Sequence, residues 1–211
     1  MSEYTTVEAQ LALTPLMGFR ALVSGAQNFL EDARSARTLS YTQLLTEVDC
    51  YAKPMGAVAQ GGKVLIAVQD PMDFVVAFLG VVAAGRCAVP VDPQAPVAEL
   101  LRTVALVKPV ALVSDRAQRA RELDLPQIRP DAHPVEDSHH GGGGSVLLLT
   151  SGSTGAPKSV RLEESRLLHV ARTVAAHNRL TPADRGYNSL PLFHVNAEVV
   201  AVLASLTAGA T

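Results

Sequence analysis

Residues 64–91, VLIAVQDPMDFVVAFLGVVAAGRCAVPV, carry the clearest secondary-structure pattern in this chain. This stretch opens and closes with unbroken apolar runs of strand length, a pattern typical of strands buried on both faces of a sheet. Between these runs, Pro71 stands at the favoured first position of a helix that we expect to extend to about Ala84, before Gly85. A strand, a helix and a strand with short connections predict two parallel strands joined by a right-handed crossover.

The same alternation continues toward the C-terminus. We expect strands at 110–113, 145–149 and 187–191, an extended segment at 159–162, and helices at 97–107, 165–179 and 194–208. The sequence therefore predicts an α/β fold, a mostly parallel sheet flanked by helices. We divide it into a first α/β unit at 1–114, an irregular Pro/Gly-rich connection at 115–144 and a second unit at 145–211.

Toward the N-terminus, apolar residues recur at near-helical spacing. They predict a helix over Met17–Ala36, an extended piece at Arg37–Tyr41 and a second helix over Thr42–Ala59. Pro54 lies inside the second helix and should kink or shorten it, because proline lacks the N–H that the helix needs.

The amino-acid composition excludes several classes of protein. Of 211 residues, 48% are hydrophobic and 18% charged, which suffices for a folded core and excludes wholesale disorder. The net charge of −2 and the lack of Trp argue against nucleic-acid binding. We see neither a membrane span nor a secretory signal, and expect a cytoplasmic protein in which Cys50 and Cys87 stay free thiols. His133, His139 and His140 lack ligands at metal-binding spacing, so we predict no metal site there.

A hydroxyl-rich loop, TSGSTGAPK at residues 150–158, directly follows the apolar run 145–149. Its two glycines allow backbone N–H groups to converge on an anion, its four hydroxyls suit phosphate oxygens, and Lys158 adds a positive charge. These residues favour phosphate binding. The alternative is a Gly/Ser-rich surface turn that needs no ligand.

The loop also comes close to the P-loop pattern of kinases and NTPases. Residues 152–159 fit G-x-x-x-x-G-K-[ST] except at Pro157, which replaces a glycine. Proline has no N–H to donate to phosphate, and the residues after Lys158 are extended where a P-loop requires a helix. We therefore interpret the match as accidental.

Residues 150–160, TSGSTGAPKSV, instead resemble the signature of the adenylate-forming superfamily, T-S-G-[ST]-T-G-x-P-K-G-V, which requires that proline. Three further segments resemble family motifs in the same order: LSYTQL at 39–44, AGRCAVPVDP at 84–93 and SLPLFH at 189–194. The last is similar to the acyl-CoA synthetase branches. Leu149 and Ser159 depart from the family's aromatic residue and glycine at these positions.

The resemblance implies ATP-dependent activation of a carboxylic acid to an acyl-adenylate, followed by transfer to coenzyme A. It implies that the ATP phosphates are bound by Thr150, Ser151, Gly152, Ser153, Thr154, Gly155 and Lys158. Thr150 would also help hold Mg²⁺, and Lys158 and His194 would be catalytic. Peptide synthetases of the family typically carry an aspartate where this chain has His194, so the resemblance favours a plain carboxylic acid over an α-amino acid.

Later family motifs are not found within residues 1–211. We therefore expect this chain to be the first part of the family's large N-terminal domain, inactive by itself and able to self-associate through its truncated end. Two alternatives stay open: a non-catalytic nucleotide- or partner-binding module, and an enzyme that loads the phosphopantetheine of a carrier protein.

Overall fold

The computed structural model describes residues 11–134, 143–150 and 158–211. Contacts divide the chain into two compact units, which we describe separately. The sheet unit comprises Val48–Glu163, and the terminal unit combines Met1–Glu47 with Glu164–Thr211. This grouping differs from the division at 114/115 and 144/145 that the sequence suggested.

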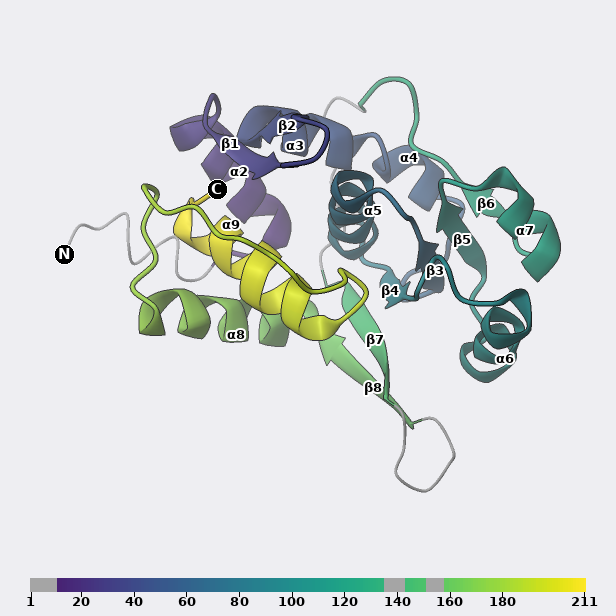
Figure 1. The fold of residues 1–211 in the computed structure, drawn as a ribbon. Coiled ribbons are helices and arrows are strands. Elements are labelled where there is room, and N and C mark those ends of the chain that lie inside the picture. Colours follow the sequence, from purple (N-terminus) through teal and green to yellow (C-terminus); the bar gives the residue numbers. More distant parts are fainter. Residues whose placement is uncertain (1–10, 135–142, 151–157) are drawn as a thin grey trace. The chain divides into compact units, whose positions relative to one another are not determined.

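A six-stranded sheet forms the centre of the sheet unit, in the order β6-β5-β3-β4-β7-β8 (Figure 1). Its elements are β3 (Lys63–Ala67), α5 (Pro71–Ala83), β4 (Cys87–Pro90), α6 (Val97–Val107), β5 (Ala111–Ser114), α7 (Ala117–Leu123), β6 (Gln127–Ile128), β7 (Ser145–Thr150) and β8 (Lys158–Glu163). The short helix α4 (Ala52–Met55) also belongs to this unit. Strands β3 to β7 pair in parallel, and β8 pairs antiparallel with β7. The predicted α/β class with a mostly parallel sheet is confirmed.

Helix α5 begins where the sequence predicts. The Asp70 carboxylate accepts hydrogen bonds from the N–H groups of Met72 and Asp73, at 2.9 and 3.0 Å, and Pro71 follows at the first position. The helix is apolar on all sides and almost completely buried, as expected for a helix enclosed in a core.

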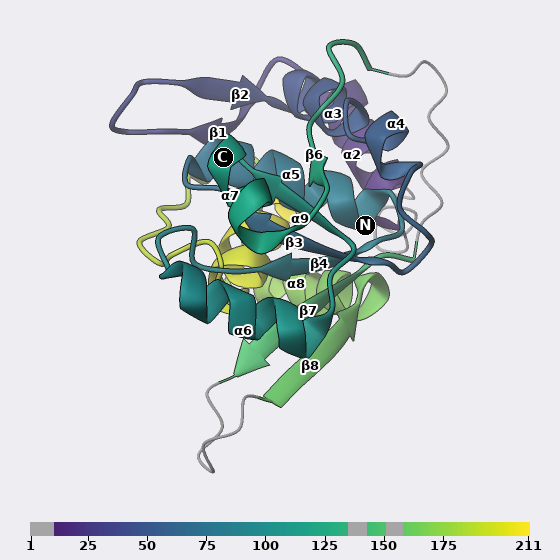
Figure 2. The ribbon, with the colours of Figure 1, turned by 90° about the vertical axis from the view of Figure 1, so that its right-hand side faces the viewer.

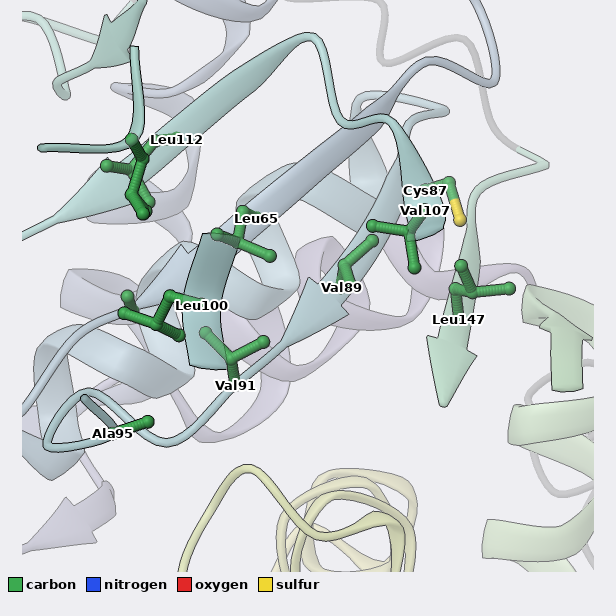
Figure 3. Packing of buried hydrophobic residues seen from close by; sticks show 11 residues of the cluster. Leu65, Cys87, Val89, Val91, Ala95, Leu100, Val107, Leu112 and Leu147 are labelled. Carbon is green, nitrogen blue, oxygen red and sulfur yellow. The ribbon is translucent and has the colours of Figure 1, made fainter. Parts of the chain in front are cut away.

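The helices cover both faces of the sheet. Helix α5 packs against β3 and β4 from one face, whereas α6 and α7 lie over the other, in front of the strands in Figure 2. On the α6 side, neighbouring strands contribute alternate residues to one apolar cluster, shown in Figure 3; its members include Leu65, Val89, Leu112 and Leu147 from strands and Leu100 and Val107 from α6. This cluster fixes β7, the strand that leads into the hydroxyl-rich loop.

The terminal unit consists of segments from both ends of the chain. It contains α2 (Leu13–Ser24), β1 (Asn28–Glu31), β2 (Thr38–Ser40), α8 (Glu164–His177), the π-helix η1 (Ala197–Leu203) and α9 (Ala204–Ala208). Helix α3 (Tyr41–Asp49) starts in this unit.

Buried polar groups join the two ends of the chain in this unit. The Glu164 carboxylate accepts a hydrogen bond at 2.7 Å from the N–H of Leu13, the first residue of α2. The Arg20 guanidinium donates to the carbonyls of Leu206, at 3.0 Å, and Thr207 at the end of α9. The Tyr41 hydroxyl donates to the Ala210 carbonyl at 2.6 Å. These bonds satisfy helix-end groups that would otherwise be buried without partners.

The N-terminal helix expected over 17–36 is wrong in both bounds. Helix α2 starts at Leu13 and ends at Ser24, and a turn at Gly25 leads into β1, where Phe29 is buried. The second expected helix is interrupted after Asp49 and resumes as the short helix α4. Because α4 contains Pro54, the predicted shortening of the helix by this proline is confirmed.

Three predictions for the C-terminal half need correction. The connection at 115–144 contains a further helix and strand, α7 and β6, because β6 pairs with β5 despite the nearby prolines. Residues 187–191 form no strand; Tyr187 is 87% exposed, and no described segment pairs with them. The last helix is a π-helix over 197–203 before it continues as α9.

The Arg20 contact generates a prediction about Gly209. This glycine ends α9 with φ of +74°, and an added Cβ would lie 2.8 Å from Arg20 Nη1. Gly209→Ala should therefore lower the free energy of unfolding by about 1–3 kcal/mol, measured by urea denaturation.

Gly18 is the matched control. It lies inside α2, and an added Cβ there meets nothing within 4 Å. Gly18→Ala should raise the free energy of unfolding by up to about 1 kcal/mol, because alanine has the higher helix propensity. Equal effects of the two substitutions would contradict the Arg20 contact.

Candidate functional site

The two ends of the hydroxyl-rich loop are held together by the β7–β8 hairpin. The antiparallel register runs from Ser145 opposite Glu163 to Thr150 opposite Lys158. The expected phosphate-binding residues Ser151, Gly152, Ser153, Thr154 and Gly155 lie between these paired ends, outside the described residues, as do the side chains of Thr150 and Lys158. The hairpin thus fixes the start and the end of the candidate phosphate loop.

Strand β8 separates this loop from the P-loop of kinases and NTPases. Lys158 begins a strand, whereas the P-loop lysine opens a helix whose N-terminus faces the phosphates. The predicted extended segment after Lys158 is therefore confirmed, and the P-loop alternative is excluded on backbone geometry.

Both departures from the family signature fit the hairpin. Ser159 is a strand residue opposite Leu149 and is not among the residues with positive φ, so its position does not require glycine. Leu149 replaces the usual aromatic residue and packs against the apolar cluster of the sheet. Neither change disturbs the backbone at the two ends of the loop.

Gly144 allows β7 to approach α5 closely. A Cβ at this position would lie 2.0 Å from the Val82 carbonyl oxygen, a distance that no side chain tolerates. The next residue, Ser145, donates its N–H to the Arg86 carbonyl at 3.0 Å. The last glycine of the run 141–144 therefore positions the strand that carries the loop.

His194 lies in the terminal unit, in the turn that precedes η1. Its N–H donates to the Pro191 carbonyl at 3.1 Å, and its own carbonyl accepts from the N–H groups of Ala197 and Glu198, at 2.9 and 3.3 Å. The imidazole is exposed, with its ring centroid 4.7 Å from that of Phe193. An exposed imidazole at a helix start is available to a ligand.

Sequence reasoning missed Glu198, the most unusual charged residue of the terminal unit. Its side chain is 1% exposed, and neither carboxylate oxygen has a hydrogen-bond partner. Burial raises the pKa of the Glu198 carboxyl to about 8. The signal was present in the sequence, because Glu198 is the one charged residue in the otherwise apolar stretch 197–204.

Among the described residues, no group of three or more His, Cys, Asp or Glu side chains could hold a metal ion. His139 and His140 lie outside the described residues. Within the described part of the chain, no helix is long and apolar enough to cross a membrane. Cys50 and Cys87 are both free thiols.

The raised pKa of Glu198 predicts how stability depends on pH. The carboxyl ionises near pH 4.5 in the unfolded chain and near 8 in the folded chain, so the folded chain binds the extra proton between these values. The associated stability is fully present below pH 4.5 and is lost as pH rises through 8. The free energy of unfolding should fall by at most about 1.4 kcal/mol per pH unit in this window.

Glu198→Gln isolates this contribution because the amide does not titrate. The difference in unfolding free energy between the two proteins, measured in urea from pH 5 to 8, should move steadily in favour of the variant. Parallel pH profiles would show that Glu198 is ionised throughout and would contradict the pKa.

Comparison with known proteins gives the site its context. The family model described as "AMP-binding enzyme" matches residues 14–211. An isonitrile lipopeptide synthase of Streptomyces coeruleorubidus is 33% identical over 190 residues, covering 83% of this chain and 13% of that protein. A sulfoacetate–CoA ligase of Cupriavidus necator is 26% identical over 244 residues, covering 99% of this chain and 46% of the ligase.

Solved structures share the fold. VinN superposes with a TM-score of 0.79 at 22% identity, over 95% of this chain and 55% of its own. ATP-bound MatB from Rhodopseudomonas palustris gives 0.80 at 20% identity, over 95% and 44%. The chain thus spans about half the length of these structures. Since the family model covers nearly every residue that the structure describes, this chain belongs to the AMP-binding enzyme family.

Proposed function

We propose that the protein containing this chain activates a carboxylic acid with ATP and passes the acyl group to the thiol of coenzyme A. The observation that carries the proposal is the sequence 150–158, whose ends are paired by β7 and β8 in a chain of the AMP-binding family. The CoA ligase among its relatives supports coenzyme A as the acceptor.

In the first step, an oxygen of the substrate carboxylate attacks the α-phosphorus of ATP, and the bond to the β-phosphate oxygen breaks. The products are the acyl-adenylate and pyrophosphate. Backbone N–H groups and hydroxyls of residues 151–155 hold the leaving phosphates, and the Lys158 ammonium stabilises the charge that develops on them. Mg²⁺, when bound with the help of Thr150, neutralises further phosphate charge.

In the second step, the thiolate attacks the acyl carbon and AMP leaves as its phosphate oxygen recovers the bonding electrons. The protein contributes mainly by positioning the two reactants. His194, exposed at the start of η1, borders the substrate carboxylate and the thiol and orients them.

A second acceptor is favoured by one relative. The likeness to an isonitrile lipopeptide synthase supports transfer to the phosphopantetheine thiol of a carrier protein. The two acceptors are distinguished by measuring AMP release from the enzyme-bound acyl-adenylate. One reaction contains free coenzyme A and the other contains a phosphopantetheinylated carrier protein.

The proposal also includes the cellular location of the protein and the self-association of the isolated chain. The protein acts in the cytoplasm, where ATP, Mg²⁺ and coenzyme A are available. The isolated chain self-associates, which is supported by exposed apolar side chains such as Tyr187, Leu190 and Val200. Light scattering at increasing concentration measures this association.

The loop assignment predicts the effect of Lys158→Ala. In the complete protein this substitution should slow ATP–pyrophosphate exchange by roughly 100-fold or more, because it removes positive charge from the leaving pyrophosphate. Lys53→Ala is the control, since Lys53 is 72% exposed and its ion pair with Asp131 lies at the surface. Exchange at the parent rate in Lys158→Ala would contradict the proposed function.

A further inference from the structure

The exposed side of helix α8 carries positive charge and no negative charge. Residues 165–183 contain three arginines, two histidines and no aspartate or glutamate. Exposed residues of α8 recur at i, i+3, i+4, i+7 and i+11, so they share one side of the helix. We call this side the basic face; it consists of Arg166, His169, Val170, Thr173 and His177, with Arg179 just after the end of the helix.

The opposite side of α8 is fixed within the terminal unit. Leu167, Leu168, Ala171 and Ala175 are buried, and the helix packs along η1 and α9 (Figure 1). Helix stability does not explain the charge of the basic face, because Arg166 lies in the first turn, where the helix dipole disfavours a cation. This positive charge is therefore better explained by a partner than by the helix itself.

The arginines of the basic face are not paired within the described part of the chain. None of the ion pairs between described residues involves Arg166 or Arg179. The acidic residues on either side of 165–183 are engaged elsewhere, since Glu164 is buried and accepts a backbone N–H, and Asp184 accepts the N–H and the hydroxyl of Thr181. The complement of the basic face is thus a negatively charged surface from outside the described chain.

A protein surface fits the basic face better than a membrane or a nucleic acid does. A helix that binds a membrane needs a broad apolar side, whereas the apolar side of α8 is buried and Val170, 47% exposed, is the large apolar side chain on the basic face. Single-stranded nucleic acids stack on aromatic side chains, and the basic face has no phenylalanine, tyrosine or tryptophan. Complementary charge, by contrast, steers and orients proteins that dock on each other.

We propose that the basic face of α8 docks an acidic carrier protein, which delivers its phosphopantetheine thiol to the acyl-adenylate. This inference rests on the proposed function, because it names the protein partner of the second acceptor. Free coenzyme A carries the same phosphopantetheine arm, so only a protein acceptor gains from a docking surface. The thiol releases its proton to solvent, and the C–S bond forms as the C–O bond to AMP breaks and AMP keeps the electron pair.

The length of the arm suits this docking surface. Helix α8 packs against η1, the helix that follows His194, and the axes of packed helices lie roughly 8–10 Å apart. A phosphopantetheine arm is roughly 15–20 Å long when extended, at the bond lengths of a peptide chain. A carrier protein on the outer side of α8 is therefore close enough for its thiol to reach past one layer of helix.

The test measures kcat/KM for AMP release by the complete protein, with either a phosphopantetheinylated carrier protein of net negative charge or free coenzyme A as the acceptor. Arg166→Glu should lower the value for the carrier protein by roughly tenfold or more, because like charges then face each other, and should change the value for coenzyme A by less than about twofold. Raising the salt concentration from about 0.05 M to about 0.5 M should weaken the parent's transfer to the carrier protein, since salt screens exposed charges. The variant should fold, because glutamate is favoured in the first turn of a helix.

Two controls separate docking from a structural effect. Arg102→Glu makes the same change of charge at an exposed arginine on α6 and should leave both values of kcat/KM unchanged. Replacing an acidic residue on the docking helix of the carrier protein by lysine should restore transfer by Arg166→Glu at least about fivefold, because opposite charges again face each other.

Each outcome decides the inference. Equal losses with both acceptors in Arg166→Glu, unchanged transfer to the carrier protein, or a parent that uses coenzyme A alone would overturn it while leaving the proposed function intact. Binding to phosphatidylserine vesicles that Arg166→Glu abolishes, with transfer to the carrier protein unchanged, would assign the basic face to a membrane instead. Absence of ATP–pyrophosphate exchange with every acid, and of AMP release with both acceptors, would overturn the proposed function and this inference with it.

Discussion

Burial on both faces of the central strands is the constraint on which the sheet unit depends. Because β3 and β4 have no exposed face, their backbone N–H and C=O groups have no access to water and must be paired along both edges. Strand β3 accordingly pairs with β4 on one side and β5 on the other, and β4 pairs also with β7. The almost fully buried helix α5 follows from the same constraint, since the strands it covers offer only apolar side chains.

The packing of this core fixes the strand that leads into the candidate phosphate loop. Strand β7 extends the parallel sheet by pairing Ser145 and Val146 with β4, and Leu147 and Leu149 secure it in the apolar cluster. Strand β8 then returns along β7 on the edge of the sheet, where its residues 159–161 are exposed. The loop is thus attached at one end to a strand that is anchored in the apolar cluster and at the other end to an exposed edge strand. The backbone at both ends of the loop is therefore paired within the sheet.

The family motifs outside the loop have structural explanations. In the segment 39–44, Ser40 and Gln43 form a capping box, in which the Gln43 N–H donates to Ser40 Oγ at 3.2 Å and the Ser40 N–H donates to Gln43 Oε1 at 2.8 Å. Tyr41 in the same segment reaches the Ala210 carbonyl. In the segment 84–93, Gly85 has φ of +74° and Arg86 donates to the Met55 carbonyl at 3.0 Å. These motifs therefore build the fold that carries the loop.

Sequence patterns correctly predicted the strands and helices that are buried among apolar residues and joined by short connections. Helix α6 has the predicted bounds, and α5, β3, β4 and β5 lie within one or two residues of prediction, because buried parallel strands and their crossovers carry a strong signal. The failures depend on contacts distant in sequence. Phe29 and Leu30 fit a helical spacing, but pairing with Leu39 makes them a strand, and the two-residue strand β6 exists only because β5 offers an edge. The loop was visible from its residue types, and Glu198 was visible as the one charged residue in the apolar stretch 197–204, but the burial of its carboxyl depends on packing that the sequence does not show.

The terminal unit contains two buried carboxyl groups, Glu164 and Glu198, whose surroundings differ. Glu164 is stabilised at the N-terminus of α2, where its oxygen satisfies an N–H and its charge complements the helix dipole. At the C-terminus of α9, the positively charged Arg20 donates to a free helix-end carbonyl in the same way. Both contacts connect segments more than 150 residues apart in sequence. Glu198 lies within η1, where the intrahelical bonds already use the backbone groups and leave no helix-end dipole to offset its charge. Within the described residues its burial is instead expressed as a raised pKa, so the carboxyl keeps its proton at pH values below about 8.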